Sequence, residues 1–439
     1  MTADPFHLAW FTSFNSPAWR SAWGGETGTE WMTGEYFVDM ARSLERAGFD
    51  FMMFEDSTMV SEALGGTSEM DLKHGLHSPK MDPLPLLPLL AAATKHMGFI
   101  ATASTSFYPP FILARTMATL DHLTRGRIGW NVVTSSEDIA GKNYGMDSLP
   151  EHDERYDRAD EFVDVVEQLW DSWEPGAIVM NQETGHYADH TKVHPINFEG
   201  KYHKVRGPLN MPAGPQGHPV LCQAGGSPRG REFSSAHANA IVTALPTVDK
   251  MKAYRADIRE RAARQGRNPD DIKVMYLVQP IIGETEAEAR AKFHQIYGMD
   301  DPMQIEQTLG VISAVTEIDF FQFPLDEEMP EGVTTNGHQS ILDDFIQRNR
   351  GKTLRESLSE RARLGPELVG TAESVADQMD SMMEEVGGDG FLIRAETGLS
   401  HNRRYIDEIS SGLAPVLRRR GLIRSSYDHA LFKDNLLAF

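Results

Sequence analysis

Eight short apolar runs, most of them separated by longer stretches with helical spacing, constrain the fold of this chain more than any other feature. The runs cover residues 7–11, 49–54, 98–105, 127–134, 220–224, 240–245, 272–282 and 390–394. Apolar residues recur with a helical period over residues 33–47, 111–123, 153–173 and 371–386. Such alternation predicts parallel strands joined by crossover helices. Eight units favour closure into a (β/α)8 TIM barrel, with a doubly wound open sheet as the alternative.

Three stretches interrupt the repeat and are predicted to be insertions. They cover about residues 59–83, 176–217 and 299–366. With them, the 439 residues fit one enlarged barrel domain better than several small domains. Loops at the carboxyl ends of barrel strands usually build the active site, so we expect all three insertions at that face.

The charge and the cysteine content argue against several classes of partner. Asp and Glu number 64 against 42 Lys and Arg, a net charge of −22, which disfavours nucleic acid and anionic membranes. The single cysteine, Cys222, allows no internal disulfide and no thiolate-rich metal site. Residues 1–10 lack the pattern of a secretion signal, so we expect a cytoplasmic protein.

Three histidines have a spacing that could suggest a metal site. His186, His190 and His194 follow one another at intervals of four, but Pro195 comes next and the stretch has the composition of a loop. We therefore interpret them as ordinary loop histidines and expect no metal.

Three polar residues stand within or directly after predicted strands. Asp56 follows the second strand and is equally consistent with a ligand contact and with a turn or helix cap. Thr102 lies inside the third strand, where threonine is common, so it indicates little by itself. Asn131 lies inside the fourth strand, where asparagine is disfavoured, and a role in binding a ligand is the better interpretation.

The segment after the run 220–224 carries the clearest signal for an anion. Gly225 and Gly226 precede Ser227, which would cap a helix with Pro228 at its first position, and Arg229 follows. A helix N-terminus with a hydroxyl and a nearby guanidinium suits a phosphate, although a purely structural turn is the alternative.

A second helix start is more ambiguous. His152 and Tyr156 are four residues apart and share one face of the helix predicted from about residue 153. They could hold an anion, or they could belong to a solvated helix start capped by Asp153.

Several motifs together match a known family. They are Tyr108-Pro109-Pro110, Ala118–Leu123, Trp130–Ser135, His152–Ala159, Val205–Leu209 and Ser227–Arg231. With them the sequence resembles the two-component FMN-dependent monooxygenases related to nitrilotriacetate and dibenzothiophene-sulfone monooxygenases, within the bacterial luciferase-like superfamily. The likeness extends over residues 7–427.

The resemblance implies a TIM barrel that binds FMN without a covalent bond. It implies that Asp56, Thr102 and Asn131 lie near the isoalloxazine ring, and that Thr102 and Asn131 orient the reacting oxygen as catalytic residues. His152, Tyr156 and Ser227, with Arg229 beside them, are implied to face the ribityl phosphate.

The resemblance also implies the partners of the reaction. A separate NAD(P)H:FMN reductase would supply FMNH2, and dioxygen would be the co-substrate. This agrees with the lack of a Gly-x-Gly-x-x-Gly fingerprint after the first predicted strand. A homodimer or homotetramer is expected.

The substrate is expected to be a small organic molecule, oxygenated with or without C–S, C–N or C–halogen cleavage. Trp10, Phe11, Phe54 and Met59 stand near strand ends and could line an apolar pocket. Arg394 could bind an anionic substrate, or it could pair with Glu396.

Three other functions remain as alternatives. They are a deazaflavin-dependent oxidoreductase of the same superfamily, a flavin-binding protein without turnover, and a barrel hydrolase using Glu55 and Asp56. The hydrolase is disfavoured because adjacent strand residues point to opposite faces.

Overall fold

Eight parallel strands close into a barrel in the computed structural model, which describes residues 4–16, 30–298, 301–395 without 331, 336, 338 and 362–364, and 402–439. Around the barrel the order is β1-β14-β11-β10-β9-β4-β3-β2. The strands are β1 His7–Ser13, β2 Phe51–Glu55, β3 Gly98–Ser104, β4 Ile128–Val133, β9 Val220–Gln223, β10 Ala240–Thr243, β11 Lys273–Val278 and β14 Gly390–Ile393. All eight predicted strands are confirmed. The doubly wound alternative is wrong, because β1 pairs with both β2 and β14 and leaves no open edge.

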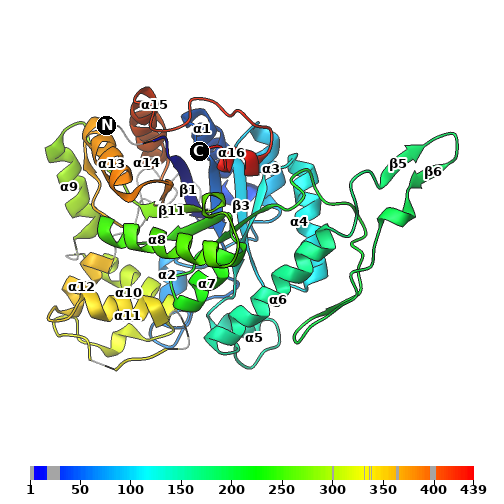
Figure 1. Cartoon of the computed structure of the whole chain (residues 1–439). Coiled ribbons are helices and arrows are strands. Elements are labelled where there is room, and N and C mark those ends of the chain that lie inside the picture. The colour runs from blue at the N-terminus through cyan, green and yellow to red at the C-terminus, as the bar shows by residue number, and fades with distance from the viewer. Residues whose placement is uncertain are drawn as a thin grey trace.

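Helices surround the barrel (Figure 1). Those of the outer ring are α1 Glu35–Ala47, α3 Leu86–Ala93, α4 Pro110–Thr124, α6 His152–Trp170, α7 Pro228–His237, α8 Val248–Arg264, α13 Ala372–Val386, α14 Arg403–Asp407 and α15 Ala414–Arg419. In α1, Phe37, Met40 and Leu44 are buried on one face, and Gly48 at a φ of 90° ends the helix. No helix of the described residues is both long and apolar enough to cross a membrane.

The alternation of side chains along each strand separates the barrel interior from the layer under the helices. Ala9, Phe51 and Met53 pack inside the barrel, together with Ile100 and Cys222. Phe432, from the C-terminal helix α16 (Phe432–Leu436), packs into the same cluster at the amino ends of the strands. The barrel is therefore plugged at that end, which leaves the carboxyl ends of the strands for a site.

Two of the three predicted insertions lie at the carboxyl ends. The first follows β2 and contains α2 (Glu69–His74). The other belongs to a larger excursion after β11. Its elements are β12 Ile281–Ile282, α9 Glu286–Tyr297, α10 Pro302–Thr316, α11 Gln339–Arg348, α12 Leu354–Arg361 and β13 Val369–Gly370. This excursion has a buried apolar cluster of its own, which includes Phe293, Leu309 and Phe320.

The predicted position of the third insertion is wrong. Residues 176–217 connect α6 to β9, and a helix-to-strand connection returns to the amino ends of a parallel barrel. Gln216 accordingly donates from Nε2 to the carbonyl oxygen of Ile128, at the start of β4 (2.8 Å). The segment forms two hairpins, β5 (Ile178–Asn181) with β6 (His186–Ala188) and β7 (Phe198–Glu199) with β8 (Lys204–Val205).

Candidate functional site

A cavity of about 460 Å³ opens at the carboxyl ends of the barrel strands. Its walls come from the ends of β1 to β4 and β9, from the insertion after β2 and from α10. The lining includes Phe11, Glu55, Asp56, Met59, His77, Lys80, Thr102, Phe107, Asn131, Tyr144, Tyr156, Gln223, Val311, Val315 and Arg394. A pocket of this size and position is typical of the active sites of barrel enzymes.

Six of the eleven residues predicted for the site lie in this lining, and five do not, namely Trp10, Phe54, His152, Ser227 and Arg229. Asp56, Thr102, Asn131, Tyr156, Phe11 and Met59 line the cavity. Trp10 and Phe54 are 1% and 0% exposed and pack under the helices, against Tyr405 and Phe37 respectively. Their assignment to the substrate pocket is wrong because each is one position out of phase with the inward-facing residues of its strand.

Thr102 and Asn131 are register partners on β3 and β4 and form one hydrogen-bonded chain. Asn131 Nδ2 donates to Thr102 Oγ1 (2.8 Å), and the Thr102 hydroxyl donates to the carbonyl oxygen of Phe54 (2.8 Å). Both side chains are buried, and Asn131 Oδ1 has no hydrogen-bond partner among the described residues. A buried acceptor of this kind is suited to an N–H group of a ligand.

A second buried amide lies at the end of β9. Gln223 Nε2 donates to the hydroxyl oxygen of Tyr156 (3.3 Å), and Gln223 Oε1 has no partner in the described part of the chain. Both Gln223 and Tyr156 line the cavity. Gln223 was not among the residues predicted for the site, although it is the last residue of β9, which leads into the Gly-rich turn.

The Gly-rich turn after β9 has the predicted local structure. Ser227 Oγ accepts a hydrogen bond from the backbone N–H of Gly230 (3.0 Å) and so caps α7, with Pro228 in its first turn. The first turn of α7 also lies close to Tyr156, because a Cβ at Gly230 would be 2.8 Å from Tyr156 Oη and 3.1 Å from Ser227 Oγ. A helix N-terminus, a serine hydroxyl and a phenol are thus gathered in one place, and of these groups the Tyr156 phenol lines the cavity.

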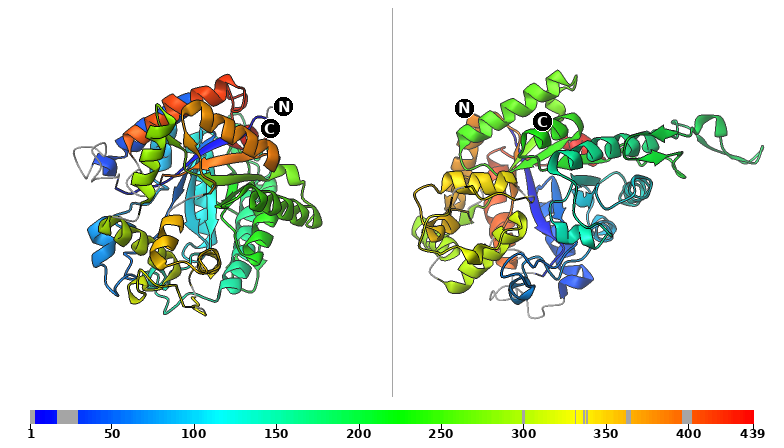
Figure 2. Two further views of the ribbon diagram at one scale, coloured as in Figure 1. Left: turned by 90° about the vertical axis from the view of Figure 1, so that its left-hand side faces the viewer. Right: turned by 90° about the horizontal axis from the view of Figure 1, so that it is seen from below.

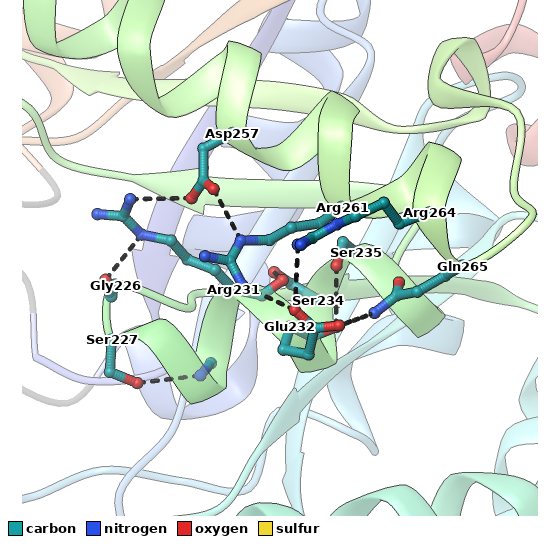
Figure 3. A network of polar contacts seen from close by, with 11 residues as sticks. Gly226, Ser227, Arg231, Glu232, Ser234, Ser235, Asp257, Arg261, Arg264 and Gln265 are labelled. Atoms are coloured by element: carbon teal, nitrogen blue, oxygen red, sulfur yellow. Dashed lines mark hydrogen bonds and ion pairs between the residues drawn. The ribbon is translucent and has the colours of Figure 1, made fainter.

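A polar network holds this turn against α8 (Figure 3). Arg231 Nε donates to the carbonyl oxygen of Gly226 (3.0 Å), and its Nη1 pairs with Asp257 (3.1 Å). Asp257 also binds Arg261, which in turn pairs with Glu232. A Cβ at Gly225 would lie 2.5 Å from Gln223 Oε1 and from the carbonyl oxygen of Gly230, so only glycine fits there.

Arg229 and His152, the two other residues predicted to face the phosphate, do not line the cavity. Arg229 donates from Nη2 to Asp157 (2.9 Å) and to Asp160, both on α6. Its guanidinium therefore ties α7 to α6, and a direct contact with a phosphate would have to compete with two carboxylates. His152 lies outside the cavity lining, with its ring edge against Tyr156 (5.2 Å between centroids) and Nδ1 2.7 Å from Asp153 Oδ1.

A carboxylate–ammonium pair forms another wall of the cavity. Lys80 Nζ lies 2.7 Å from Glu55 Oε2 and 2.7 Å from Ser57 Oγ, and Ser13 Oγ donates to Glu55 (2.7 Å). Burial disfavours the charged form of Glu55, but the Lys80 ammonium outweighs it and lowers the pKa of Glu55 to about 2. No sequence pattern indicated Lys80, which lies in an insertion, 25 residues from Glu55 along the chain.

The pKa of Asp56 is shifted in the opposite direction from that of Glu55. Burial, and next the charge of Glu55, raise the pKa of Asp56 to about 7. The Asp56 carboxyl can therefore gain or lose a proton near neutral pH while it faces the cavity.

The remaining wall is largely apolar. Phe107 and Tyr144 stack with ring centroids 4.2 Å apart, and Val311 and Val315 face the cavity from α10. The Arg394 guanidinium lies over the Phe11 ring, 5.1 Å from its centroid. Glu396, the alternative partner considered for Arg394, lies outside the described residues.

The three loop histidines lie in the segment that carries β5 and β6, away from the cavity. His194 pairs with Glu174, and His190 begins a single helical turn. Within the described ranges, no group of three or more His, Cys, Asp or Glu side chains could hold a metal ion.

Known proteins share both the sequence and the fold. The family described as "Luciferase-like monooxygenase" matches residues 6–390. The chain is 33% identical to the dibenzothiophene-sulfone monooxygenase of Rhodococcus erythropolis (strain XP), covering 98% of this chain and 96% of that protein. It is 36% identical to nitrilotriacetate monooxygenase component A of Aminobacter aminovorans, covering 92% and 89%. The crystal structure of a riboflavin lyase with modified FMN and riboflavin superposes with a TM-score of 0.88, at 31% identity, over 99% of this chain and 96% of that one.

Proposed function

Because this chain belongs to the luciferase-like monooxygenases, we propose that it binds FMN in the barrel cavity and uses reduced FMN and dioxygen to oxygenate a small organic substrate. The observation that carries the proposal is the pair of buried amide oxygens, Asn131 Oδ1 and Gln223 Oε1, which both lack donors among the described residues and belong to side chains that line one cavity. The capped N-terminus of α7 lies next to Tyr156, which lines the same cavity. An isoalloxazine ring offers N–H donors, and its ribityl chain ends in a phosphate.

The isoalloxazine ring would lie over Thr102 and Asn131. Their hydrogen-bonded chain fixes the amide so that its oxygen can accept from a ring N–H. The same two side chains could orient oxygen next to the ring, as expected from the family resemblance. Asp56, at the end of β2, would hold or release a proton at its carboxylate oxygen on the same side of the cavity.

The phosphate would lie at the corner formed by Ser227, Tyr156 and the first turn of α7. Free N–H groups at a helix N-terminus and the helix dipole favour an anion there. His152 is beside Tyr156 and could reach a phosphate by rotation of its exposed side chain. Arg229 would act mainly by positioning α7 against α6.

When bound, reduced FMN supplies the electrons and the centre at which dioxygen is activated. The residues of this chain then have to exclude water, which promotes unproductive release of peroxide. Val311 and Val315 of α10, with the stacked Phe107 and Tyr144, provide the apolar cover for that purpose.

A separate NAD(P)H:flavin reductase would supply the reduced FMN. Two observations support this: the sequence lacks a dinucleotide-binding fingerprint after its first strand, and one relative is named as a component A. The apolar wall suits a small organic substrate, whose oxygenation could break a C–S, C–N or C–halogen bond.

Two measurements test the proposal. Anaerobic titration with FMNH2 and with FMN should show saturable binding, tighter for the reduced form. Oxygen uptake with NADH and a flavin reductase should then yield less hydrogen peroxide per dioxygen when the right substrate is added. Failure to bind either flavin would refute the cofactor assignment. Binding of a deazaflavin in preference to FMN would favour the oxidoreductase alternative, and FMN binding without oxygenation of any substrate would favour the non-catalytic one.

A further inference from the structure

The insertion after β2 brings two histidines, His74 and His77, to the wall of the cavity. Its helix α2 packs against α10 of the excursion after β11, at the carboxyl ends of the barrel strands (Figures 1 and 2). His74 belongs to this contact between helices, because its Nε2 lies 3.0 Å from Glu306 Oε2 on α10. His77 makes no contact of that kind, and the flavin proposal gives it no role.

His77 forms a histidine–carboxylate pair with Asp71 of α2. His77 Nδ1 lies 2.8 Å from Asp71 Oδ1, and the backbone N–H of His77 donates to the same oxygen (3.1 Å). Asp71 is buried, and its Oδ2 has no partner among the described residues. The carboxylate therefore fixes the ring with a proton on Nδ1. No residue in the described part of the chain bonds to Nε2, so this nitrogen can exchange a proton in the cavity.

The residues on both sides of His77 hold the ring in place. Ser78 Oγ donates to the carbonyl oxygen of Met59, at the start of the insertion (3.0 Å). Leu76 packs on α10 at Gly310, where a Cβ would overlap Leu76 Cδ1. The imidazole is thus fixed beside the helix that carries the apolar cover of the cavity, as a group that acts on a substrate has to be.

The other charged and titratable groups on the elements around His77 are largely paired with one another. They are Lys73 and His74 on α2, Glu306 on α10, Glu55 and Asp56 at the end of β2, and Lys80 in the insertion. Glu306 binds both Lys73 and His74, and Lys80 binds Glu55. Burial raises the pKa of Glu55, whereas Lys80 and, to a smaller extent, His77 lower it. Asp56, whose pKa burial and then Glu55 raise to about 7, is the alternative proton acceptor.

A histidine base suits a substrate group that still carries its proton at neutral pH and can give it up. Imidazole exchanges its proton near pH about 6.5, a thiol near about 8.5 and a phenol near about 10, whereas a carboxylic acid is already ionised. The cavity wall contains Phe11 and the stacked pair Phe107 and Tyr144, which favour an aromatic ring over an alkyl thiol. Base and wall together match a small phenol.

We propose that His77 is the general base that takes the hydroxyl proton of a phenol-type substrate through Nε2, with Asp71 as its positioning residue. The phenol O–H bond breaks, an Nε2–H bond forms, and the electron pair stays on the phenolate oxygen. The Asp71 carboxylate compensates the charge of the imidazolium. A phenolate ring is richer in electrons than a phenol and reacts more readily with an electrophilic oxygen. This consequence rests on the proposed oxygenation, whereas the proton transfer itself needs no flavin.

Titration of the full-length protein with 4-nitrophenol tests the transfer, because the phenolate of this probe absorbs visible light and the phenol does not. Half of the bound probe should be ionised at a pH at least about one unit below that of the free probe, as expected beside a group that becomes cationic. His77→Gln keeps a polar side chain that cannot take the proton, and should abolish the shift. Asp71→Asn should reduce it, because an amide does not compensate the imidazolium. The probe 4-nitroanisole has no hydroxyl and should bind equally to the parent and to His77→Gln.

His186→Gln is the matched control, since it makes the same change at an exposed position outside the cavity and should keep the full shift. The melting temperature shows whether each variant is folded, and His77→Asn takes the place of His77→Gln if the latter does not fold. The proposal is overturned if the parent binds no probe or shows no shift, if His77→Gln keeps the shift, or if only Asp56→Asn abolishes it.

The same titration with FMN present separates this proposal from that of the cofactor. The probe should stay bound when FMN is added, because the substrate and the flavin occupy different parts of the cavity. Displacement of the probe by FMN would place it in the flavin's position and would overturn the role of His77. A protein that shifts the ionisation of the probe but binds no FMN would contradict the proposed function and still support the proton transfer to His77.

Discussion

Asn131 Nδ2 lies 2.8 Å from Thr102 Oγ1, and the Thr102 hydroxyl uses its one proton on the carbonyl oxygen of Phe54. Thr102 can therefore only accept from Asn131, so the amide must turn its NH2 group toward Thr102 and its oxygen toward the cavity. The carbonyl oxygen of Phe54 on β2 thus determines, through the Thr102 hydroxyl, that the Asn131 amide oxygen faces the cavity.

Asn131→Ala should weaken FMN binding and uncouple oxygen use from product formation. Loss of one neutral hydrogen bond costs about 0.5–1.5 kcal/mol, so the Kd for FMNH2 should rise about 2- to 12-fold. Thr102→Val is the matched control: it keeps the amide but removes the group that orients it, and should give a smaller change in Kd with a clear rise in peroxide. Unchanged Kd and unchanged peroxide yield in both variants would remove Asn131 from the site.

Tyr156→Phe should affect FMN more than riboflavin. Its hydroxyl lies beside the first turn of α7, at the proposed phosphate corner, and riboflavin lacks the phosphate. A hydrogen bond to a charged group contributes about 1.5–3 kcal/mol, so the ratio of FMN to riboflavin affinity should fall by about one order of magnitude or more. Equal loss of affinity for both ligands would place the phosphate elsewhere.

Ser227→Ala tests the same corner with a second readout. Its Oγ caps α7, so the substitution should cost about 0.5–2 kcal/mol of stability in addition to the affinity for FMN. Ser227→Asp keeps a cap but adds a negative charge, and should retain the melting temperature while FMN binding fails. Loss of stability without any change in FMN affinity for Ser227→Ala would reduce Ser227 to a structural cap.

The barrel could be predicted from the sequence because each of its strands and helices is indicated by residues within that element. Each strand and each main helix has its own apolar pattern, as in α1 with Phe37, Met40 and Leu44 on one face. The positions of the insertions were harder to predict. The composition of residues 176–217 indicates a loop but not its end of the barrel. That end depends on their order in the repeat, after α6 and before β9.

Part of the site could be predicted, because some of its residues stand out within their own strand. Asp56 and Asn131 could be identified because they are polar residues in or after apolar strands. Trp10 and Phe54 were misassigned because a one-residue error in phase turns a strand side chain to the other face. Lys80 could not be predicted, since its contact with Glu55 depends on how an insertion folds back over the strand ends. Whether the cavity residues bind flavin stays a prediction.

Asp56 should give the protein a pH dependence near neutrality. Burial, with the charge of Glu55, raises its pKa to about 7, so the folded state favours the protonated carboxyl. The contribution of this raised pKa to the free energy of unfolding is fully present below pH about 4, the ordinary pKa of aspartate. It is lost as the pH rises through 7. Asp56→Asn should therefore lose less melting temperature between pH 5 and pH 8 than the parent does. Asp249→Asn, at an exposed position at the start of α8, should follow the parent. Parallel curves for the parent and Asp56→Asn would show that Asp56 is ionised as in a free peptide.

Lys80→Met should destabilise the folded protein by isolating the Glu55 carboxylate. The Lys80 side chain is 5% exposed and that of Glu55 is 35% exposed, so the pair is only partly screened by solvent. Removing one partner of a buried pair costs about 3–5 kcal/mol, and partial exposure of Glu55 should reduce the loss to about 2–3 kcal/mol at pH 7. The low pKa of Glu55 means that the parent's stability from this pair is present above pH about 4.5 and lost as the pH falls toward 2. The Lys80→Met variant should instead regain stability relative to the parent as the pH is lowered toward 4, because its Glu55 can then be protonated.

Adding Glu55→Gln to Lys80→Met removes the isolated charge and should restore most of the melting temperature at pH 7. If the double variant is no more stable than Lys80→Met, the loss arises from packing around Lys80 and the charge pair contributes little.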